Sequence, residues 1–269
     1  MEKKLMIIVA VAAVAVLAIA GIAIVLMNQP QGKDINSIDD LDGARIAVQT
    51  GTTGDGFVKE KYEDTGKATI HRYTTYPDAI NDLKNKKVDA IVMDKAPAEA
   101  YVKANKGIKI LDAKLDTKTE SYGFVFKLNN TALKSDFDTA LAELKSEGKL
   151  AEIEQYWLEH SDGMADPFIT STGTGSTLKV GTSPDFPPYD ALYDSAFTGI
   201  DMDIIRAICN KLNYKVEFKN YDFEAIIAAV DTGALDVGAS GFSIEESRKS
   251  EVLFSEPYAT TEQVVVVRA

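Results

Sequence analysis

The sequence contains few of the residues that form disulfides and metal centres. It has one cysteine and two histidines among 269 residues. Cys209 therefore has no partner for a disulfide within the chain, and its apolar helical surroundings predict a small buried side chain. Without clustered cysteine and histidine we expect no zinc site, and nothing in the sequence requires a cofactor.

Basic residues are also scarce. The chain has 29 lysines and arginines against 41 aspartates and glutamates, which gives a formal net charge of −12. Proteins that bind nucleic acid need a basic surface, so a nucleic-acid partner is not expected. Hydrophobic residues make up 45% of the chain, which is enough for one large domain or for two lobes of ordinary size.

Charge is absent from one stretch near the amino terminus. Residues 5–27 form an uncharged apolar run of 23 residues, long enough to cross a bilayer as a helix. Lys3 and Lys4 before the run predict that it is oriented with everything after it outside the cytoplasm. A cleaved secretory signal is the alternative, because Ala18-Ile19-Ala20 is similar to a cleavage site. We therefore expect residues 1–33 to be a membrane anchor and tether, or a removed signal on a secreted protein.

After residue 34, short apolar strands alternate with amphipathic helices, which predicts an α/β fold with sheets covered on both faces. The predicted strands are residues 44–49, 68–73, 90–94, 108–111, 122–126, 178–182, 215–219, 235–239 and 263–268. The predicted helices are residues 76–85, 96–103, 131–147, 150–159, 201–212 and 223–232, with others beginning near Asp55 and after Ser243. Residues 161–177 are rich in Gly, Ser and Thr, which is typical of a flexible linker.

One pattern occurs twice. Residues 76–89 and 223–236 share their apolar spacing and a final aspartate at a constant offset of 147 positions. Each copy is a helix leading into a strand, and each strand ends at a polar candidate, Asp94 in one copy and Ser240-Gly241 in the other. Two similar α/β lobes facing a common cleft would explain the pattern. A chance match of a helix followed by a strand is the alternative.

Residues 236–248 suggest a receptor for a small carboxylate. The strand there runs into Ser240-Gly241, and Ser243 followed by Glu246 has the form of a capping box at a helix start. A helix start favours an anion, and Arg248 carries a planar fork suited to a carboxylate. The alternative is an ordinary strand-to-helix turn with a solvated arginine.

Residues 50–54, Thr-Gly-Thr-Thr-Gly, form a second candidate loop. The loop lacks the Lys-Ser/Thr ending of a P-loop and the Gly-x-Gly-x-x-Gly spacing of a dinucleotide site, so nucleotide binding is not expected. A turn between a strand and a helix is nevertheless a common ligand position in open α/β sheets.

Several of these segments resemble the polar amino-acid class of bacterial solute-binding proteins, the receptors of ABC importers. Those that carry the resemblance are residues 178–189 (LKVGTSPDFPPY), 199–203, 240–248, 254–258, 37–43 and 48–54. The resemblance implies a two-lobed, type II periplasmic-binding-protein-like hinge fold. Such a protein closes on an amino acid and delivers it to an ABC permease in the membrane. It is not an enzyme, and a monomer is the expected form.

The order of the segments differs from that of the family, because the part that normally comes first lies last. This is the pattern of a circular permutation, joined through residues 161–177; a fragment of a tandem array is the alternative. We expect a smaller lobe of residues 34–118, completed by a strand at 262–269, and a larger lobe of residues 119–261. The lobes should be connected near residues 117–122 and 258–262.

The resemblance also implies roles for individual residues. Arg248, Ser243 and Gly241 would hold the α-carboxylate of an amino acid with help from Thr52 and Thr53, and Asp94 would accept the α-ammonium group. Phe186, Tyr189 and Phe223 would pack against the ligand side chain, and the positions expected to vary with the ligand or to line its site are Ser183, Asp185, Gln49, Met93 and Ser240. The alternatives are a solvated acid for Asp94 and core packing for the aromatic residues. The family often has an acid in place of Ser183 and a threonine in place of Ser243, which leaves side-chain specificity open.

Two other functions fit the same fold. One is a dehydratase acting on small carboxylates, which would need a general acid or base in the cleft. Neither His71 nor His160 falls in a motif that would line it. The other is a ligand-sensing ectodomain, which would need a partner for signalling.

Overall fold

The computed structural model describes residues 32–269. The predicted membrane-spanning run, residues 5–27, lies outside this part of the chain. Within residues 32–269, every helix is too short or too polar to cross a membrane.

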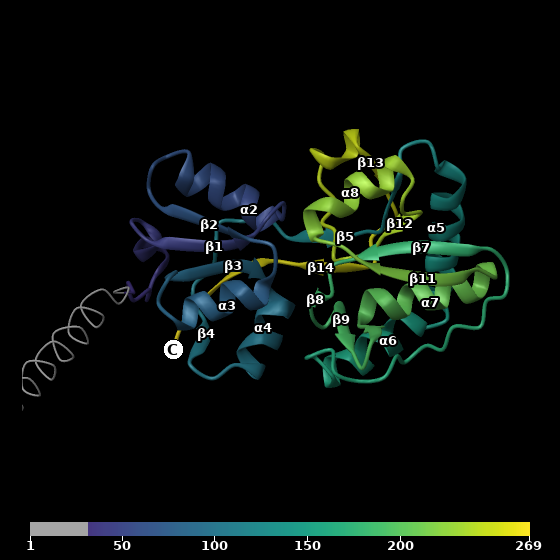
Figure 1. The fold of residues 1–269 in the computed structure, drawn as a ribbon, viewed down its shortest axis with the longest axis horizontal. Coiled ribbons are helices and arrows are strands. Elements are labelled where there is room, and N and C mark those ends of the chain that lie inside the picture. Colours follow the sequence, from purple (N-terminus) through teal and green to yellow (C-terminus); the bar gives the residue numbers. More distant parts are fainter. Residues whose placement is uncertain (1–31) are drawn as a thin grey trace, which may run out of the picture.

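The described chain folds into two α/β lobes joined by a narrow two-stranded ribbon (Figure 1). The smaller lobe contains a five-stranded sheet in the order β2-β1-β3-β15-β4. Its strands are β1 (Arg45–Gln49), β2 (Thr69–Tyr73), β3 (Ala90–Asp94), β4 (Ile108–Ile110) and β15 (Gln263–Arg268). Its helical segments are η1 (Ile38–Leu41), α2 (Thr53–Val58), η2 (Lys59–Glu63), α3 (Tyr76–Lys84) and α4 (Lys95–Ala104).

Strand β3 shows why this sheet is buried on both faces. Successive side chains of a strand point to opposite faces. Ala90 and Val92 pack in the core on the side of α2, whereas Ile91 and Met93 pack in the core on the side of α3 and α4. An apolar strand without polar alternation is what a sheet covered on both faces requires.

The last strand of the chain, β15, lies inside this sheet rather than beside it. It pairs antiparallel with β3, where Val264 lies opposite Met93, and with β4, where Val267 lies opposite Lys109. The run of four valines suits a pleated strand between two neighbours. Residues from the two ends of the described chain therefore build one sheet.

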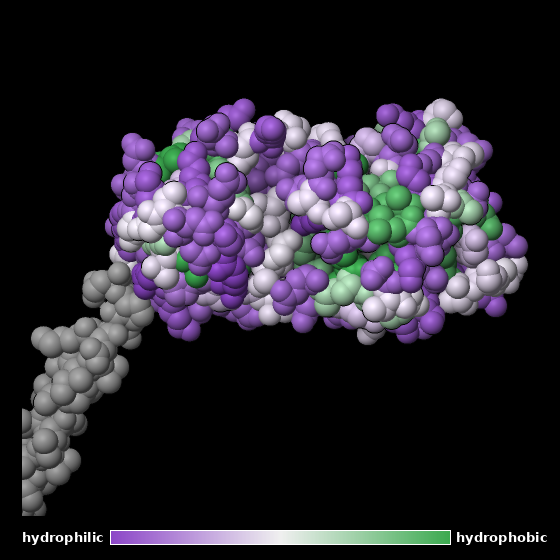
Figure 2. All heavy atoms as spheres, turned by 90° about the horizontal axis from the view of Figure 1, so that it is seen from above, coloured by the Kyte–Doolittle hydropathy of each residue, from purple (hydrophilic) through white to green (hydrophobic). Residues whose placement is uncertain are grey.

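The larger lobe contains a five-stranded sheet in the order β11-β7-β12-β6-β13 and a small antiparallel sheet in the order β10-β9-β8. Its strands are β6 (Val125–Lys127), β7 (Thr177–Thr182), β8 (Asp185–Phe186), β9 (Asp190–Tyr193), β10 (Ala196–Thr198), β11 (Lys215–Asn220), β12 (Val237–Gly238) and β13 (Val252–Phe254). Its helices are α5 (Thr131–Ser146), α6 (Lys149–Glu159), α7 (Ile200–Leu212) and α8 (Phe223–Thr232). Seen from above, the smaller lobe is mostly hydrophilic, and apolar side chains gather on the larger lobe (Figure 2).

The ribbon between the lobes consists of β5 (Glu120–Tyr122) and β14 (Ala259–Thr261), paired antiparallel. Both strands lie within the ranges where the connections between the lobes are expected. The strand predicted for residues 122–126 is interrupted at Gly123, so that β5 belongs to the ribbon and β6 to the larger lobe. A Cβ atom at Gly123 would lie 3.1 Å from Ile244, which makes a side chain costly there.

The helix predicted to begin after Ser243 is wrong. The backbone N–H of Ile244 donates to the carbonyl of Ser121 at 2.8 Å, and the N–H of Gly123 donates to the carbonyl of Phe242 at 2.9 Å. Because this backbone is paired with the ribbon, it is extended at Ser243, and only a short 3-10 turn, η3 (Arg248–Ser250), follows.

Residues 161–177, which the sequence predicts to be a flexible linker, make hydrogen bonds to the larger lobe. The backbone N–H groups of Phe168 and Ile169 donate to the carboxylate of Asp203 at 2.9 and 3.2 Å. Further along, the N–H of Thr172 donates to the side chain of Asn210 at 2.7 Å. Polar side chains of α7 thus hold the segment against the larger lobe.

Candidate functional site

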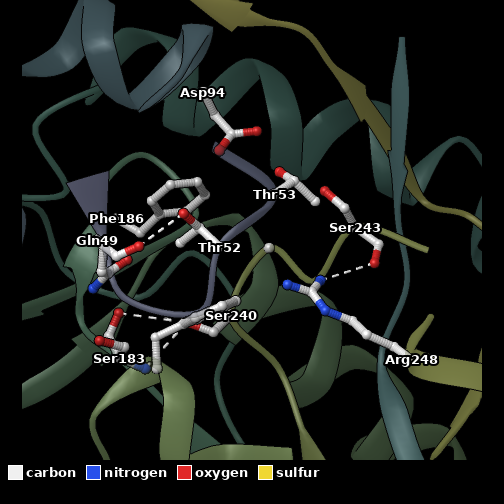
Figure 3. A pocket seen from close by; sticks show the side chains of 11 residues that line it. Gln49, Thr52, Thr53, Asp94, Ser183, Phe186, Ser240, Ser243 and Arg248 are labelled. Carbon is white, nitrogen blue, oxygen red and sulfur yellow. Dashed lines mark hydrogen bonds between the residues drawn. The ribbon is translucent and has the colours of Figure 1, made fainter. Parts of the chain in front are cut away.

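A closed cavity lies between the lobes, and its walls are the residues that the sequence predicts (Figure 3). The smaller lobe contributes Gln49, Thr52, Thr53 and Asp94, and the larger lobe contributes Ser183, Phe186, Phe223, Ser240, Gly241, Ser243 and Arg248. The cavity volume is about 10 Å³, room for roughly one water molecule. The lobes must therefore part before a larger ligand can enter.

The lining residues lie at the carboxyl ends of parallel strands in both lobes. Gln49 ends β1 and Asp94 ends β3, and these strands are parallel neighbours. In the larger lobe Ser183 follows β7, and Ser240 comes shortly after β12, its parallel neighbour. Ligands of open α/β sheets bind at this edge, so the two sheets present their binding edges to each other.

Arg248 is the cation of the cavity. Its side chain is 11% exposed and packs over the rings of Phe223 and Phe242. Nη1 donates to the carbonyl of Ser243 at 3.0 Å, and Nη2 donates across the cleft to the carbonyl of Gly51 at 2.9 Å. Burial lowers the pKa of Arg248, but a guanidinium stays charged in proteins. A ligand carboxylate could replace the carbonyl of Gly51 as its partner.

Asp94 faces the cavity from the opposite lobe. It precedes α4, but its side chain does not cap that helix. Instead the hydroxyl of Tyr122 donates to Oδ1 of Asp94 at 2.7 Å, and the side chains of Gln263 and Thr261 also lie close to this carboxylate. Burial, and then the nearby charge of Glu120, raises the pKa of Asp94 to about 7. Such a carboxylate gains from a cationic partner.

Glu120, on the ribbon strand β5, is a charged neighbour of the cavity that the sequence analysis missed. Its carboxylate accepts hydrogen bonds from Ser243 and from Nε2 of Gln263. The signal that could have identified it is the strand period, since Glu120 shares one face of β5 with Tyr122.

Asp185 joins the two lobes at the other end of the cavity. Its Oδ1 accepts from the hydroxyl of Ser183 at 2.8 Å, within the larger lobe. Its Oδ2 accepts from Nε2 of Gln49 at 3.2 Å and from the backbone N–H of Tyr76 at 2.8 Å, both in the smaller lobe. Burial raises the pKa of Asp185, and these hydrogen bonds oppose the shift.

Three serine and glycine positions are already engaged by the protein. The N–H of Gly241 donates to Asp201 at 2.9 Å, and the hydroxyl of Ser240 accepts from the N–H of Ser183 at 3.1 Å. Gly241 has φ +55°, and a Cβ there would lie 2.6 Å from the ring of Phe186. In this structure Gly241 therefore admits the Phe186 ring and does not offer its N–H to the cavity.

Aromatic rings close one side of the site. Phe186 borders the cavity and stacks on Tyr76 with ring centroids 5.9 Å apart. Tyr189 does not border the cavity; it lies behind Phe186 and meets Tyr122 edge to face at 5.0 Å. Tyr189 therefore packs in the core and does not face a ligand, which is the alternative given for the aromatic residues. Met93 is likewise buried in the core.

The described residues offer little to a metal or to acid–base chemistry by histidine. Within residues 32–269 no group of three or more His, Cys, Asp or Glu side chains is arranged to hold a metal ion. His71 lies on β2, His160 contacts the carbonyl of Tyr156, and neither borders the cavity.

The family model described as "Bacterial extracellular solute-binding proteins, family 3" matches residues 178–269. This part of the chain, residues 178–269, is therefore similar to that family. The matched segment contains every cavity residue of the larger lobe, from Ser183 to Arg248. The cavity residues of the smaller lobe, from Gln49 to Asp94, lie outside it.

Curated relatives match over parts of their length. A "Probable histidine-binding protein" of Campylobacter jejuni is 36% identical over 85 residues, which are 32% of this chain and 33% of the relative. A "Putative ABC transporter arginine-binding protein 2" of Escherichia coli is 30% identical over 132 residues, which are 48% of this chain and 53% of the relative. The chain thus spans between a third and about half of the length of these two relatives. Among solved structures, "An ancestral arginine-binding protein bound to arginine" is 45% identical over 31% of this chain and 37% of that chain, with a TM-score of 0.30.

Proposed function

We propose that this protein binds a polar amino acid between its lobes and delivers it to an ABC importer. The observation that carries the proposal is the placement of Arg248 and Asp94, which face one interlobe cavity from opposite lobes. An α-amino acid is a zwitterion with a carboxylate and an ammonium group a few ångströms apart. Arg248 suits the carboxylate and Asp94 the ammonium group. The relatives named as histidine- and arginine-binding proteins support the same class of ligand.

Binding and closure are coupled because the two charged groups belong to different lobes. A ligand held by Arg248 alone interacts with one lobe, whereas contact with Asp94 requires the lobes to be together. The ligand therefore stabilises the closed arrangement by its differential contacts, as in other hinge-closing receptors. The β5–β14 ribbon is the hinge, and the permease recognises the closed form.

Cationic amino acids are the first candidates within this class. Among the described residues that line the cavity, Arg248 is the cation and Asp94 the acid, and Asp185 and Glu120 lie behind the wall as further acids. An acidic ligand would meet uncompensated repulsion there. Arginine and histidine also appear in the names of the relatives.

The proposal extends to the organisation of the whole chain. Residues 1–33 hold a monomeric protein at the outer face of the membrane, and the two lobes follow in circularly permuted order. The smaller lobe comprises residues 34–118 and 262–269, and the larger lobe residues 119–261. The pairing of β15 with β3 and β4 supports this division.

A screen of the full chain tests the function. Native mass spectrometry looks for a co-purified amino acid, and thermal unfolding is followed with each of the twenty L-amino acids. A ligand that binds only the native state raises the unfolding temperature. We expect one amino acid, or one chemically related group, to do so. A protein that none of the twenty stabilises would contradict the proposal.

A further inference from the structure

Glu120, on the hinge strand β5, lies close to Asp94, the acid that lines the cavity from the smaller lobe. Glu120 and Tyr122 are two residues apart on β5, so their side chains share one face of the ribbon. Tyr122 reaches Asp94 with its hydroxyl, which places Glu120 on the cavity side of the hinge, beside Asp94.

The contacts of Glu120 connect both walls of the cavity. One carboxylate oxygen accepts from the hydroxyl of Ser243, in the larger lobe. The other accepts from Nε2 of Gln263 at 3.1 Å, and the same nitrogen lies 3.1 Å from the hydroxyl of Thr53 in the smaller lobe. Ser243 and Thr53 both line the cavity, so Glu120 lies directly behind the point where the lobes meet.

Gln263 adds an unmatched acceptor to this group. It is 4% exposed, and its Oε1 has no hydrogen-bond partner among the described residues. A buried acceptor without a donor is unfavourable. Asp94 borders the cavity, and Glu120 and Gln263 add acceptors just behind the wall beside it. A group with several donors would be stabilised at this end.

The groups that face Asp94 do not supply its countercharge. They are Tyr76 from α3, Glu120 and Tyr122 from β5, Thr261 from β14, Gln263 from β15, and Tyr189 and Arg248 from the larger lobe. Of these Arg248 is the cation, and it is engaged by the carbonyls of Ser243 and Gly51 and by the carboxylate of Glu245, 3.6 Å from its Nε. An ammonium group has three donors and a positive charge, so it fits this acceptor group in both respects.

We propose that Glu120 acts with Asp94 as a two-carboxylate receptor for the α-ammonium group of the ligand. This inference rests on the proposed function and goes beyond it, because it assigns a recognition role to the hinge. Ser243 and Gln263 position the carboxylate of Glu120. The site then requires the ammonium group strongly and rejects carboxylic acids that lack it.

The two carboxylates also predict that ligand binding releases a proton. Burial and the charge of Glu120 raise the pKa of Asp94 to about 7, so near pH 6 the free site holds a proton that an ammonium group displaces. Binding at pH 6 therefore releases a proton, and binding at pH 8 does not. Without the charge of Glu120 the pKa of Asp94 falls, and the release at pH 6 becomes smaller.

The test compares Glu120→Gln with Glu262→Gln in the full chain. Glu262 follows β14 in the same ribbon, but it pairs with Lys95 on the outside and does not border the cavity. The probes are L-arginine with 5-guanidinopentanoate and L-histidine with 3-(imidazol-4-yl)propanoate; the second of each pair lacks the α-amino group. Proton release is measured by calorimetry in buffers of different ionisation enthalpy, with the amino acid of the screen that binds most tightly.

We expect Glu120→Gln to reduce the preference for the amino acid over its deaminated analogue by about tenfold or more. It should also reduce proton release at pH 6. Glu262→Gln should change neither quantity by more than about twofold. Glu120→Asp keeps the negative charge. It should therefore retain part of the preference for the amino acid and part of the proton release at pH 6.

The possible failures are distinguishable. If wild type binds an amino acid and Glu120→Gln retains both the preference and the proton release, the two-carboxylate receptor is wrong and the proposed function stands. A wild-type protein that binds none of the twenty amino acids overturns both. Equal loss of affinity for an amino acid and its deaminated analogue would show that Glu120 acts only on structure, and would also overturn the inference.

Discussion

The carboxylate of Asp185 accepts a hydrogen bond from the backbone N–H of Tyr76 at 2.8 Å, across the cleft between the lobes. Tyr76 is the first residue of α3, where backbone N–H groups lack partners within the helix and an anion is favoured. At the opposite end of the cavity, Arg248 bonds the carbonyl of Gly51. The lobes are thus held together at both ends by contacts of the protein itself.

Replacing Asp185 by alanine should favour the open arrangement. Oδ2 of Asp185 loses its bonds with Tyr76 and Gln49, and hydrogen bonds to charged groups contribute about 1.5–3 kcal/mol each. Small-angle X-ray scattering without ligand should show a larger radius of gyration, and amino-acid affinity should fall by about tenfold because the closed state is less populated. Asp231→Ala, at an exposed position on α8 of the same lobe, is the matched control. An unchanged radius of gyration would show that Asp185 does not hold the lobes together.

Replacing Asp94 by asparagine should stabilise the ligand-free protein at high pH. The pKa of Asp94 is raised to about 7 in the folded state, from an ordinary value of 3.8. Its contribution to stability is therefore present at low pH and is lost as the pH rises from about 4 to 7. Between pH 5 and pH 8 the stability advantage of Asp94→Asn over wild type should grow by about 2–3 kcal/mol. Urea unfolding at both pH values measures it, and an advantage that shrinks with pH would contradict the assigned charge state.

Removing residues 263–269 should unfold the smaller lobe. The deletion takes β15 from between β3 and β4 and exposes the edges of both strands. A Gly-Ser insertion after Ser171 is the control, because the contacts of Asp203 and Asn210 hold the chain on both sides of it and loop closure depends weakly on length. Circular dichroism during heating should show lost cooperativity for the deletion and near-wild-type unfolding for the insertion. Equal stability of the two variants would contradict the permuted arrangement.

The elements that the sequence predicts well are those with an uninterrupted apolar run or a regular helical pattern. The predicted bounds of β3, β15 and α8 match the structure, because an apolar run or a clear helical period decides them locally. The helix after Ser243 was wrong because pairing of Ile244 with the ribbon outweighs a good capping sequence. The contacts of the predicted linker, residues 161–177, could not be predicted, because the acceptors on α7 that hold its N–H groups are far away in sequence.

The cavity residues also divide into those that a local pattern predicts and those that depend on distant contacts. The candidate residues from Gln49 to Arg248 were predicted through a family resemblance. The structure places most of them around one cavity, whereas Tyr189 and Met93 are buried in the core and Asp185 lies behind the cavity wall. Glu120 and the bridging position of Asp185 were missed because their significance lies in partners from the other lobe or from β15, such as Tyr76 and Gln263. Local patterns do not record which distant groups a carboxylate will face.

The central claim is that Arg248 and Asp94 together hold one amino acid per chain. Isothermal titration calorimetry on the full chain, with the tightest-binding amino acid of the screen, tests it directly on wild type, Arg248→Ala and Asp94→Asn. We expect one site per chain in wild type and a loss of about 2–5 kcal/mol of binding free energy in each variant, with the circular dichroism spectrum retained. Affinities within about threefold of wild type in both folded variants would contradict the claim.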